Sequence, residues 1–163
     1  MKKIIALALA FAIFGISLPA LSLSPSKMDR EIQCMAANIY WEAKNESEEG
    51  KMAVAQVTIN RANSSHYPDS ICQVVHQKYK NVCQFSWVCH HPHDKINEEL
   101  WQECLEISHK ALLWGETHGK LHRTDALYYH ASYVKPYWAK SKVRLTKIGN
   151  HIFYADKIMV ASR

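Results

Sequence analysis

Residues 40–46, Tyr-Trp-Glu-Ala-Lys-Asn-Glu, place two carboxylates next to aromatic and apolar side chains. Glu46 follows Glu42 by four residues, which is one helical turn if a helix continues that far. An apolar environment disfavours the charged form of a carboxyl group, so Glu42 is expected to keep its proton near neutral pH. A protonated carboxyl group beside a cleft is the general acid that cleavage of a glycosidic bond requires. Glu46 either influences Glu42 directly or forms a structural hydrogen bond, and the second interpretation is favoured.

Other polar and aromatic side chains could contact a sugar polymer. Gln84 and Ser86 can hydrogen-bond hydroxyl and N-acetyl groups, and Phe85 offers a flat face to a sugar ring, although it is equally expected as a core residue. Tyr129 alternates with its neighbour on a predicted strand and is the one expected to face the cleft. The residues predicted to bind substrate are therefore Glu46, Gln84, Phe85, Ser86, Tyr129 and His151.

The elements that must position these residues are helices first and strands later. Apolar residues at helical spacing predict a helix over 29–44. A second helix follows Ser47 as its N-cap and runs towards Arg61, a short one covers 71–77, and a long one runs from 97 to Gly115. Strands are predicted at 126–130, 143–146 and 151–154, and 78–95 is predicted as a long loop. This order predicts an α+β fold with a small antiparallel sheet in its C-terminal half.

The N-terminus and the composition favour an exported chain. Residues 1–22 have two lysines, an apolar run and small residues near position 20, as expected of a signal peptide that is removed. Residues 23–163 then form one domain, expected to be monomeric and without a stable membrane anchor, in the periplasm, the cell wall or outside the cell. Its 18 basic and 15 acidic residues give a net charge of +3, which suits an anionic wall polymer or simply solubility. No basic run accompanies the aromatic residues, so nucleic-acid binding is not expected.

Five cysteines leave two further questions open. An exported chain permits disulfides, whose pairing cannot be read from the sequence, and Cys104 on an apolar helical face is expected to be the buried odd thiol. Cysteines and histidines cluster in residues 83–93, but their spacing favours a disulfide over zinc, and no metal or cofactor is expected.

Two functions are alternatives to the cleavage of a glycosidic bond by Glu42. One is a wall amidase or peptidase with Cys34 or Cys83 as nucleophile and His130 as base. Another is a glycan-binding module without catalysis.

The motifs as a set resemble a known family. Residues 40–46 resemble the Tyr-x-Glu-Ala-Arg-Gly-Glu signature of SleB/CwlJ-type cell wall hydrolases, which include spore cortex-lytic enzymes and their Gram-negative and phage relatives. Further blocks agree in the family's order, namely residues 49–57, 60–61, 67–75, 83–87, 126–129, 138 and 148–154. The chain departs from the family at Lys44, Asn45 and Ser47, in the turn after the first helix.

The resemblance implies a fold related to lysozymes and lytic transglycosylases. It also implies cleavage of peptidoglycan glycan strands between N-acetylmuramic acid and N-acetylglucosamine, with Glu42 as the catalytic acid. No aspartate lies close to Glu42 in the sequence. This permits a lytic transglycosylase mechanism, which needs a single carboxyl group and is the expected one. Hydrolysis as a muramidase, with a second carboxylate from a distant part of the chain, stays open.

Overall fold

Helix α1 (Lys27–Ala43) is the central element of the helical layer and ends beside Glu42. The computed structural model describes residues 25–90, 92–113 and 125–157, so the predicted signal peptide lies outside the described residues. A capping box starts α1: the Ser26 hydroxyl accepts from the Asp29 N–H, and the Asp29 carboxylate accepts from the Ser26 N–H. The predicted helix is confirmed, with a start two residues earlier than expected.

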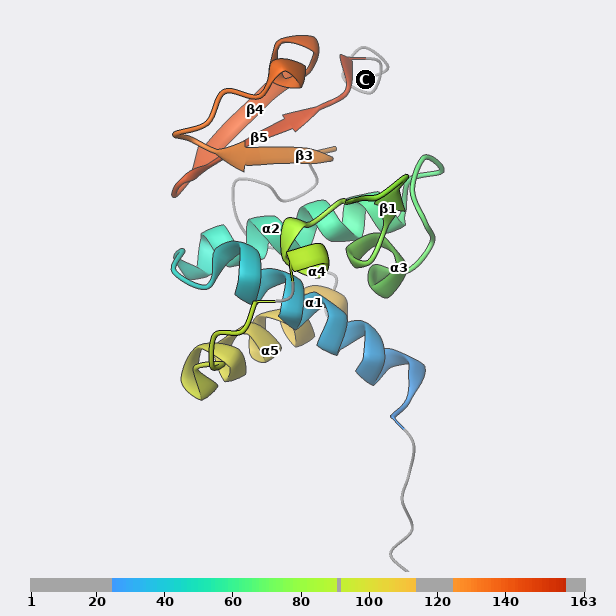
Figure 1. The fold of residues 1–163 in the computed structure, drawn as a ribbon, viewed down its shortest axis with the longest axis vertical. Coiled ribbons are helices and arrows are strands. Elements are labelled where there is room, and N and C mark those ends of the chain that lie inside the picture. The colour runs from blue at the N-terminus through green and yellow to red at the C-terminus, as the bar shows by residue number, and fades with distance from the viewer. Residues whose placement is uncertain (1–24, 91, 114–124, 158–163) are drawn as a thin grey trace, which may run out of the picture.

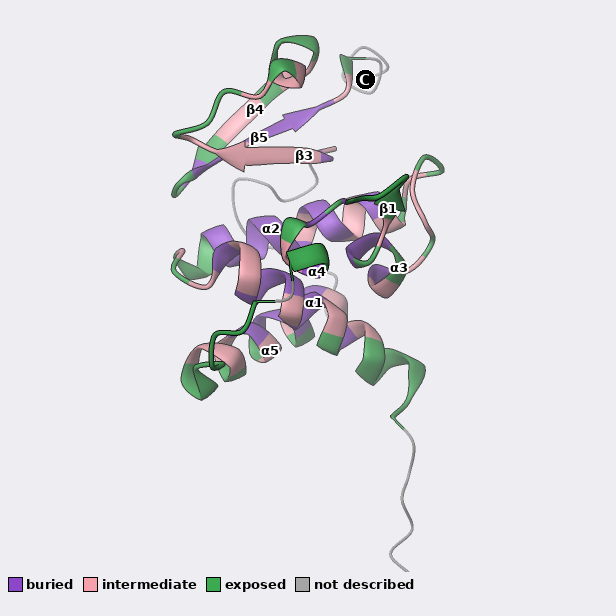
Figure 2. Ribbon diagram, in the orientation of Figure 1, coloured by how far each residue is buried: buried purple, intermediate pink, exposed green. Residues whose placement is uncertain are grey.

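Three further helices pack against α1: α2 (Glu48–Ala62), α3 (Ile71–Val75) and α5 (Glu98–Leu113). Ser47 and Ser70 cap α2 and α3 as N-cap residues, each accepting from a backbone N–H three residues later. Their apolar faces meet in one core, which includes Met35, Ile39 and Ile107. Figure 2 shows the buried residues concentrated along α1 and α2 and on strand β5 of the sheet described below.

The segment over 78–95 is more ordered than the loop predicted there. It contains a short hairpin of β1 (Lys78–Tyr79) and β2 (Val82–Cys83), followed by the one-turn helix α4 (Ser86–His90). Phe85 and Val88 are buried in the helical core and anchor the segment. This segment is thus ordered by the burial of a few apolar residues and by a disulfide. It lacks the periodic apolar pattern from which longer helices and strands are predicted.

The C-terminal part is a three-stranded antiparallel sheet stacked on the helices (Figure 1). Its strands are β3 (Tyr128–Ala131), β4 (Val143–Ile148) and β5 (His151–Ala155), in the order β3-β5-β4, and a 3-10 helix η1 (Tyr137–Ser141) precedes β4. A second core cluster joins the sheet to α2 through Ala53, Val57, Ala126, Ile148 and Phe153. The predicted α+β class and the antiparallel sheet are confirmed.

Two disulfides hold the helical layer. Cys34 in α1 is bonded to Cys72 in α3, and Cys83 is bonded to Cys89 across α4. Cys104 is free and buried, as predicted. No described helix combines the length and the apolarity that crossing a membrane would require.

Candidate active site

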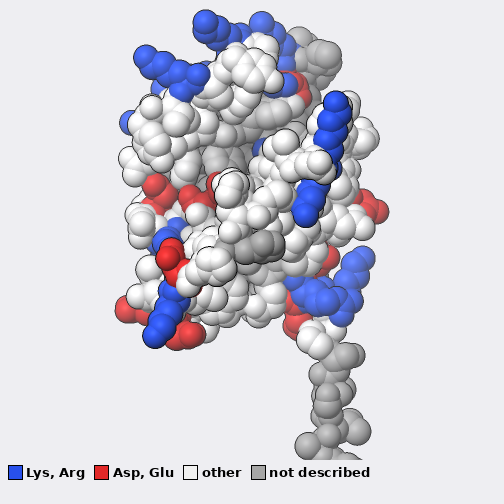
Figure 3. Space-filling view, viewed as in Figure 1, with Lys and Arg blue, Asp and Glu red and all other residues white. Residues whose placement is uncertain are grey.

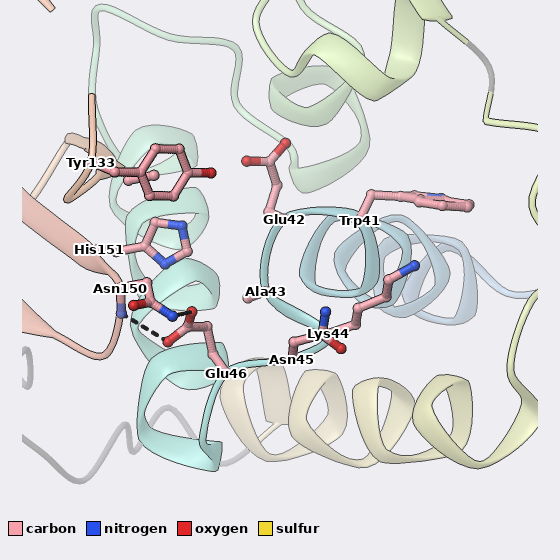
Figure 4. A pocket seen from close by; sticks show the side chains of 10 residues that line it. Trp41, Glu42, Ala43, Lys44, Asn45, Glu46, Tyr133, Asn150 and His151 are labelled. Carbon is pink, nitrogen blue, oxygen red and sulfur yellow. Dashed lines mark hydrogen bonds between the residues drawn. The ribbon is translucent and has the colours of Figure 1, made fainter. Parts of the chain in front are cut away.

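Glu42 lies in the last turn of α1 and lines a cleft of about 240 Å³ between the helices and the sheet. The end of α1 and the turn after it form one wall, and the sheet forms the other through Ala131, Tyr133, Asn150 and His151 (Figure 4). Figure 4 shows the hydroxyl group of Tyr133 directed across this space towards the Glu42 carboxyl group. The site is therefore built where the two layers of the fold meet.

Tyr129 of β3 holds the Glu42 carboxyl group. Its hydroxyl donates a hydrogen bond of 3.1 Å to Oε2 of Glu42, a contact between residues 87 positions apart. Burial raises the pKa of Glu42 above its ordinary value, and the Tyr129 hydrogen bond and the charge of Arg61 only partly oppose this. Burial also raises the pKa of Tyr129 well above its ordinary value, so the phenol remains a hydrogen-bond donor. Glu42 therefore stays protonated to a higher pH than an exposed glutamate.

Arg61 is a functional candidate that the sequence analysis did not single out. It is buried in the last turn of α2, where Nε donates to the Leu127 carbonyl at 2.8 Å and the guanidinium lies 5.4 Å from the ring centroids of Tyr67 and Phe85. Its Nη1 has no hydrogen-bond partner among the described residues. Its burial in the structure makes it a functional candidate, because buried cations are usually paired or functional.

Glu46 forms a clamp with the β4–β5 turn. Its Oε2 accepts from the Asn150 backbone N–H at 3.0 Å, and its Oε1 accepts from the Asn150 side-chain amide at 2.9 Å. Gly149 has a φ of +53°, and a β-carbon there would lie 1.9 Å from Glu46 Oε2. The turn therefore requires glycine both for its backbone conformation and for the approach of the carboxylate. The contacts are those of the structural hydrogen bond that the sequence analysis favoured for Glu46.

His151 follows this clamp and lines the same cleft. It is 8% exposed, and its Nδ1 has no partner among the described residues. Its ring packs edge-on against that of Tyr129, with 5.2 Å between centroids. Burial lowers the pKa of His151, which favours a neutral imidazole in the wall of the cleft.

The three residues predicted in the 78–95 segment are not among those that line this cleft. Gln84 and Ser86 are exposed, whereas Phe85 is 4% exposed and lies in the core, with its ring under the Arg61 guanidinium. The structure thus brings Glu42, Glu46, Tyr129 and His151 together and leaves Gln84, Phe85 and Ser86 outside the group. Trp41 and Tyr133, by contrast, line the cleft and were not predicted to do so.

Comparisons with known proteins agree with this geometry. A family model described as cell wall hydrolase matches residues 45–154. The chain belongs to this family. Glu42 precedes the matched region by three residues, so its role is argued from the site and from the motif around it.

Curated relatives of this cell wall hydrolase are spore cortex-lytic enzymes. That of Oceanobacillus iheyensis is 29% identical over 136 residues, which are 83% of this chain and 45% of the relative. That of Bacillus subtilis is 27% identical over 126 residues, or 77% of this chain and 37% of the relative. The chain thus spans less than half the length of the curated relatives it matches.

Solved structures show the same fold. The catalytic domain of the germination-specific lytic transglycosylase SleB from Bacillus anthracis has a TM-score of 0.58 at 26% identity, over 80% of this chain and 96% of that domain. The catalytic domain of the Bacillus cereus SleB protein gives the same TM-score and identity, over 80% and 92%. The predicted family resemblance and the lytic-transglycosylase-like fold are confirmed.

The alternative with a cysteine nucleophile is wrong. Cys34 and Cys83 are both in disulfides, and burial raises the pKa of the remaining thiol, Cys104, to about 11. The proposed base, His130, bonds the Tyr154 hydroxyl and the Ala131 carbonyl, each at 2.9 Å.

The Cys/His cluster over 83–93 is closed by the Cys83–Cys89 disulfide, and His91 lies outside the described residues. Within the described ranges, no three or more His, Cys, Asp or Glu side chains gather in a way that could hold a metal ion.

Proposed function

We propose that this hydrolase cleaves peptidoglycan glycan strands between N-acetylmuramic acid and N-acetylglucosamine, as a lytic transglycosylase with Glu42 as its catalytic residue. The observation that carries the proposal is the half-buried Glu42 carboxyl group, held by Tyr129 in a cleft with its pKa raised. Membership of the cell wall hydrolase family directs the proposal to wall polymers. The similarity to the catalytic domain of SleB from Bacillus anthracis, a germination-specific lytic transglycosylase, favours the glycan strand over the peptide.

Glu42 acts first as an acid and then as a base. Its proton passes to the glycosidic oxygen as the bond from that oxygen to C1 of the muramoyl residue breaks. The resulting carboxylate then takes the proton of the muramoyl C6 hydroxyl, whose oxygen bonds to C1 and closes a 1,6-anhydro ring. No water is consumed, and Glu42 ends the cycle protonated as it began.

Tyr129 and Arg61 support the second half of this cycle. The Tyr129 hydrogen bond and the Arg61 charge both favour the ionised form of Glu42, against the effect of burial. Proton donation would otherwise leave a carboxylate in an apolar site, which is costly. Both side chains thus stabilise the state that forms after Glu42 has donated its proton.

A single working carboxyl group supports transglycosylation over hydrolysis by two carboxylates. Among the described residues that line the cleft, the other carboxylate is Glu46, and both its oxygens already accept hydrogen bonds from Asn150. An inverting or retaining hydrolase needs a second carboxylate free to activate water or attack C1. Glu46 is better placed to hold the cleft in shape.

Substrate contacts are proposed for the open side of the cleft. Tyr133 is 83% exposed and presents a ring and a hydroxyl group opposite Glu42, and Trp41 provides a second flat surface. The His151 ring lines the same cleft and is proposed to contact a hydroxyl or acetamido group of the sugar. Contacts from Gln84 and Ser86 stay predictions, and they would be to sugars bound farther along the glycan strand.

The disulfides suit an oxidising compartment, so we also propose that the chain acts in the wall outside the cell membrane. We further propose that it acts as a monomer.

The test is digestion of purified sacculi by the wild type, Glu42→Gln and a control, Glu49→Gln. Glu49 is exposed in the first turn of α2 and does not line the cleft. Glu42→Gln should fold and release at least about 10²-fold less soluble muropeptide, whereas the control should match the wild type. Mass spectrometry should find 1,6-anhydro ends in the wild-type products.

Other outcomes would contradict specific parts of the proposal. Undiminished release by Glu42→Gln would remove Glu42 from the mechanism. Reducing ends would indicate hydrolysis. Retention on sacculi without release of fragments by the wild type would favour the glycan-binding module.

A further inference from the structure

Charge is distributed unevenly between the two layers of the molecule. Residues 125–157, which form the sheet and η1, contain six basic and two acidic residues, a net charge of +4. Residues 25–113, which form the helices, contain nine basic and twelve acidic residues, a net charge of −3. Figure 3 shows Lys and Arg gathered over the sheet end of this face, whereas both signs are mixed over the helices. The mild positive net charge of the whole chain thus combines a cationic sheet layer with an anionic helical layer.

The register of the sheet places part of this charge on its outer face. Arg144 pairs with Tyr154, and Lys147 pairs with Ile152. Directly paired residues of adjacent strands share a face, and faces alternate along a strand. Phe153 lies in the core cluster shared with α2, so Arg144 and Lys147 lie on the opposite, outer face.

Two more cations extend this surface across the segment between β3 and β4. The four exposed residues Lys135, Lys140, Arg144 and Lys147 are called here the cationic surface. Within the part of the chain that the structure describes, none of them forms an ion pair. Lys142, by contrast, is paired with Asp156. The positive charges of the cationic surface are therefore not neutralised by ion pairs among the described residues.

The chain segments that carry the cationic surface continue into the rim of the Glu42 cleft. Lys135 is two residues from Tyr133, which lines the cleft, and Lys147 is three residues from Asn150, which also lines it. The Ser132 N–H donates to the Asn150 carbonyl at 2.6 Å, so the segment after β3 lies beside the β4–β5 turn. A ligand that leaves the cleft past the β4–β5 turn therefore follows the chain segments that carry these cations.

We infer that the cationic surface binds the carboxylates of peptidoglycan stem peptides, an inference that rests on the proposed function. A muramoyl residue bound beside Glu42 carries its stem peptide on the lactyl group, so the peptide must leave the cleft with the glycan in place. Stem peptides present several free carboxylates in an extended chain, which suits cations spread over a strand and a neighbouring segment. The helical layer as a whole has a net charge of −3, which disfavours the same anion over that layer. The surface thus orients a strand by its peptides while Glu42 acts on its sugars.

The test compares two double charge reversals in the Glu42→Gln background, which keeps the wall material intact during binding. Arg144→Glu/Lys147→Glu changes the cationic surface. Lys27→Glu/Lys95→Glu makes the same change of net charge at two exposed positions of the helical layer. Binding is measured by sedimentation with acid-treated sacculi free of teichoic acid, and with the same glycan after an amidase has removed the stem peptides. Circular dichroism and thermal melting establish that both variants are folded.

The sheet variant should bind stem-bearing sacculi about tenfold more weakly at low salt than its parent, with a difference that shrinks as salt is raised. The helical control should bind as its parent does, and the loss shown by the sheet variant should be much smaller on peptide-free glycan, which carries fewer carboxylates. Equal binding of the sheet variant and its parent to stem-bearing sacculi would overturn the inference. So would an equally large loss on peptide-free glycan, which keeps one lactyl carboxylate per muramoyl residue, or a loss seen only with teichoic acid or with phosphatidylglycerol vesicles.

The same two reversals in the active chain separate this inference from the proposed function. Peptide-free glycan strands should be cleaved at the same rate with and without the sheet reversal. Failure of the wild type to cleave them would refute the proposed glycan cleavage and leave the binding result to be judged by itself.

Discussion

Replacing Tyr129 by Phe removes the hydroxyl that donates to Glu42 and leaves the ring in place. The ring packs at 5.7 Å from Phe153 and 5.2 Å from His151, so the local packing is retained. The hydrogen bond favours the ionised form of Glu42. Its loss must therefore raise the pKa of Glu42 further, because the effect of burial then acts with less opposition.

The size of the shift follows from the bond. A hydrogen bond to a charged group contributes about 1.5–3 kcal/mol. At 3.1 Å this contact is longer than a strong hydroxyl-to-carboxylate bond, so the lower end applies. About 1.4 kcal/mol corresponds to one pKa unit and to a tenfold change in rate. Tyr129→Phe should move the loss of activity at high pH upward by about one unit. It should also slow the reaction about tenfold, since donation leaves a less stable carboxylate.

The assay is the pH dependence of soluble muropeptide release at low substrate concentration. Tyr128→Phe is the matched control, because the neighbouring hydroxyl faces the other side of β3 and donates to Asp156 at 3.0 Å. The control should keep both the wild-type rate and its pH profile. A slower Tyr129→Phe enzyme whose high-pH limb stays in place or moves down would refute the reasoning. The hydroxyl would then act on the substrate rather than on Glu42.

Three further predictions concern stability. Gly149→Ala should cost about 3 kcal/mol in urea unfolding, and only about 1 kcal/mol in a Glu46→Ala background, because the clash with the carboxylate is then gone; equal costs in both backgrounds would contradict the clash. Phe85→Ala should cost about 3–5 kcal/mol and Gln84→Ala under about 0.5 kcal/mol, and a stable Phe85→Ala chain with weaker wall binding would instead make that ring a substrate contact. Glu42→Gln should melt like the wild type at pH 4 and higher at pH 8. The reason is that the raised pKa of Glu42 makes its neutral form favourable to folding, a contribution lost as pH rises through the folded pKa; equal melting temperatures at pH 8 would contradict this.

The main elements could be predicted because their signals are local. Ser47 and Ser70 mark the starts of α2 and α3, and the apolar stripe of α1 marks its buried face. Gly149 and Asn150 mark the turn between β4 and β5. The 78–95 segment was predicted less well. Its hairpin has two residues per strand, and its order depends on the Cys83–Cys89 bond and on burial of Phe85 against distant helices.

The site could be predicted in part, for the same reason. Glu42 was recognisable from its aromatic neighbours and Tyr129 from the alternation of a strand. Arg61 and Tyr133 were not, because nothing local indicates that a helix end and an exposed turn meet beside Glu42. Phe85 was ambiguous from the outset, since an aromatic side chain in a loop can be either a sugar platform or a core residue.

In the proposed mechanism a single carboxyl group serves as both acid and base, and the two layers of the fold supply the contacts that this requires. Burial alone would favour the protonated form of Glu42. The carboxylate left after Glu42 donates its proton would then be poorly stabilised. The groups that correct this come from elsewhere: Tyr129 from the sheet and Arg61 from α2. The effect of Tyr129 depends on the position of the sheet, which Glu46, between α1 and α2, holds through its two hydrogen bonds from Asn150. Glu46 thus influences the chemistry through the position of the sheet, and its loss should perturb the pH profile of Glu42 together with stability.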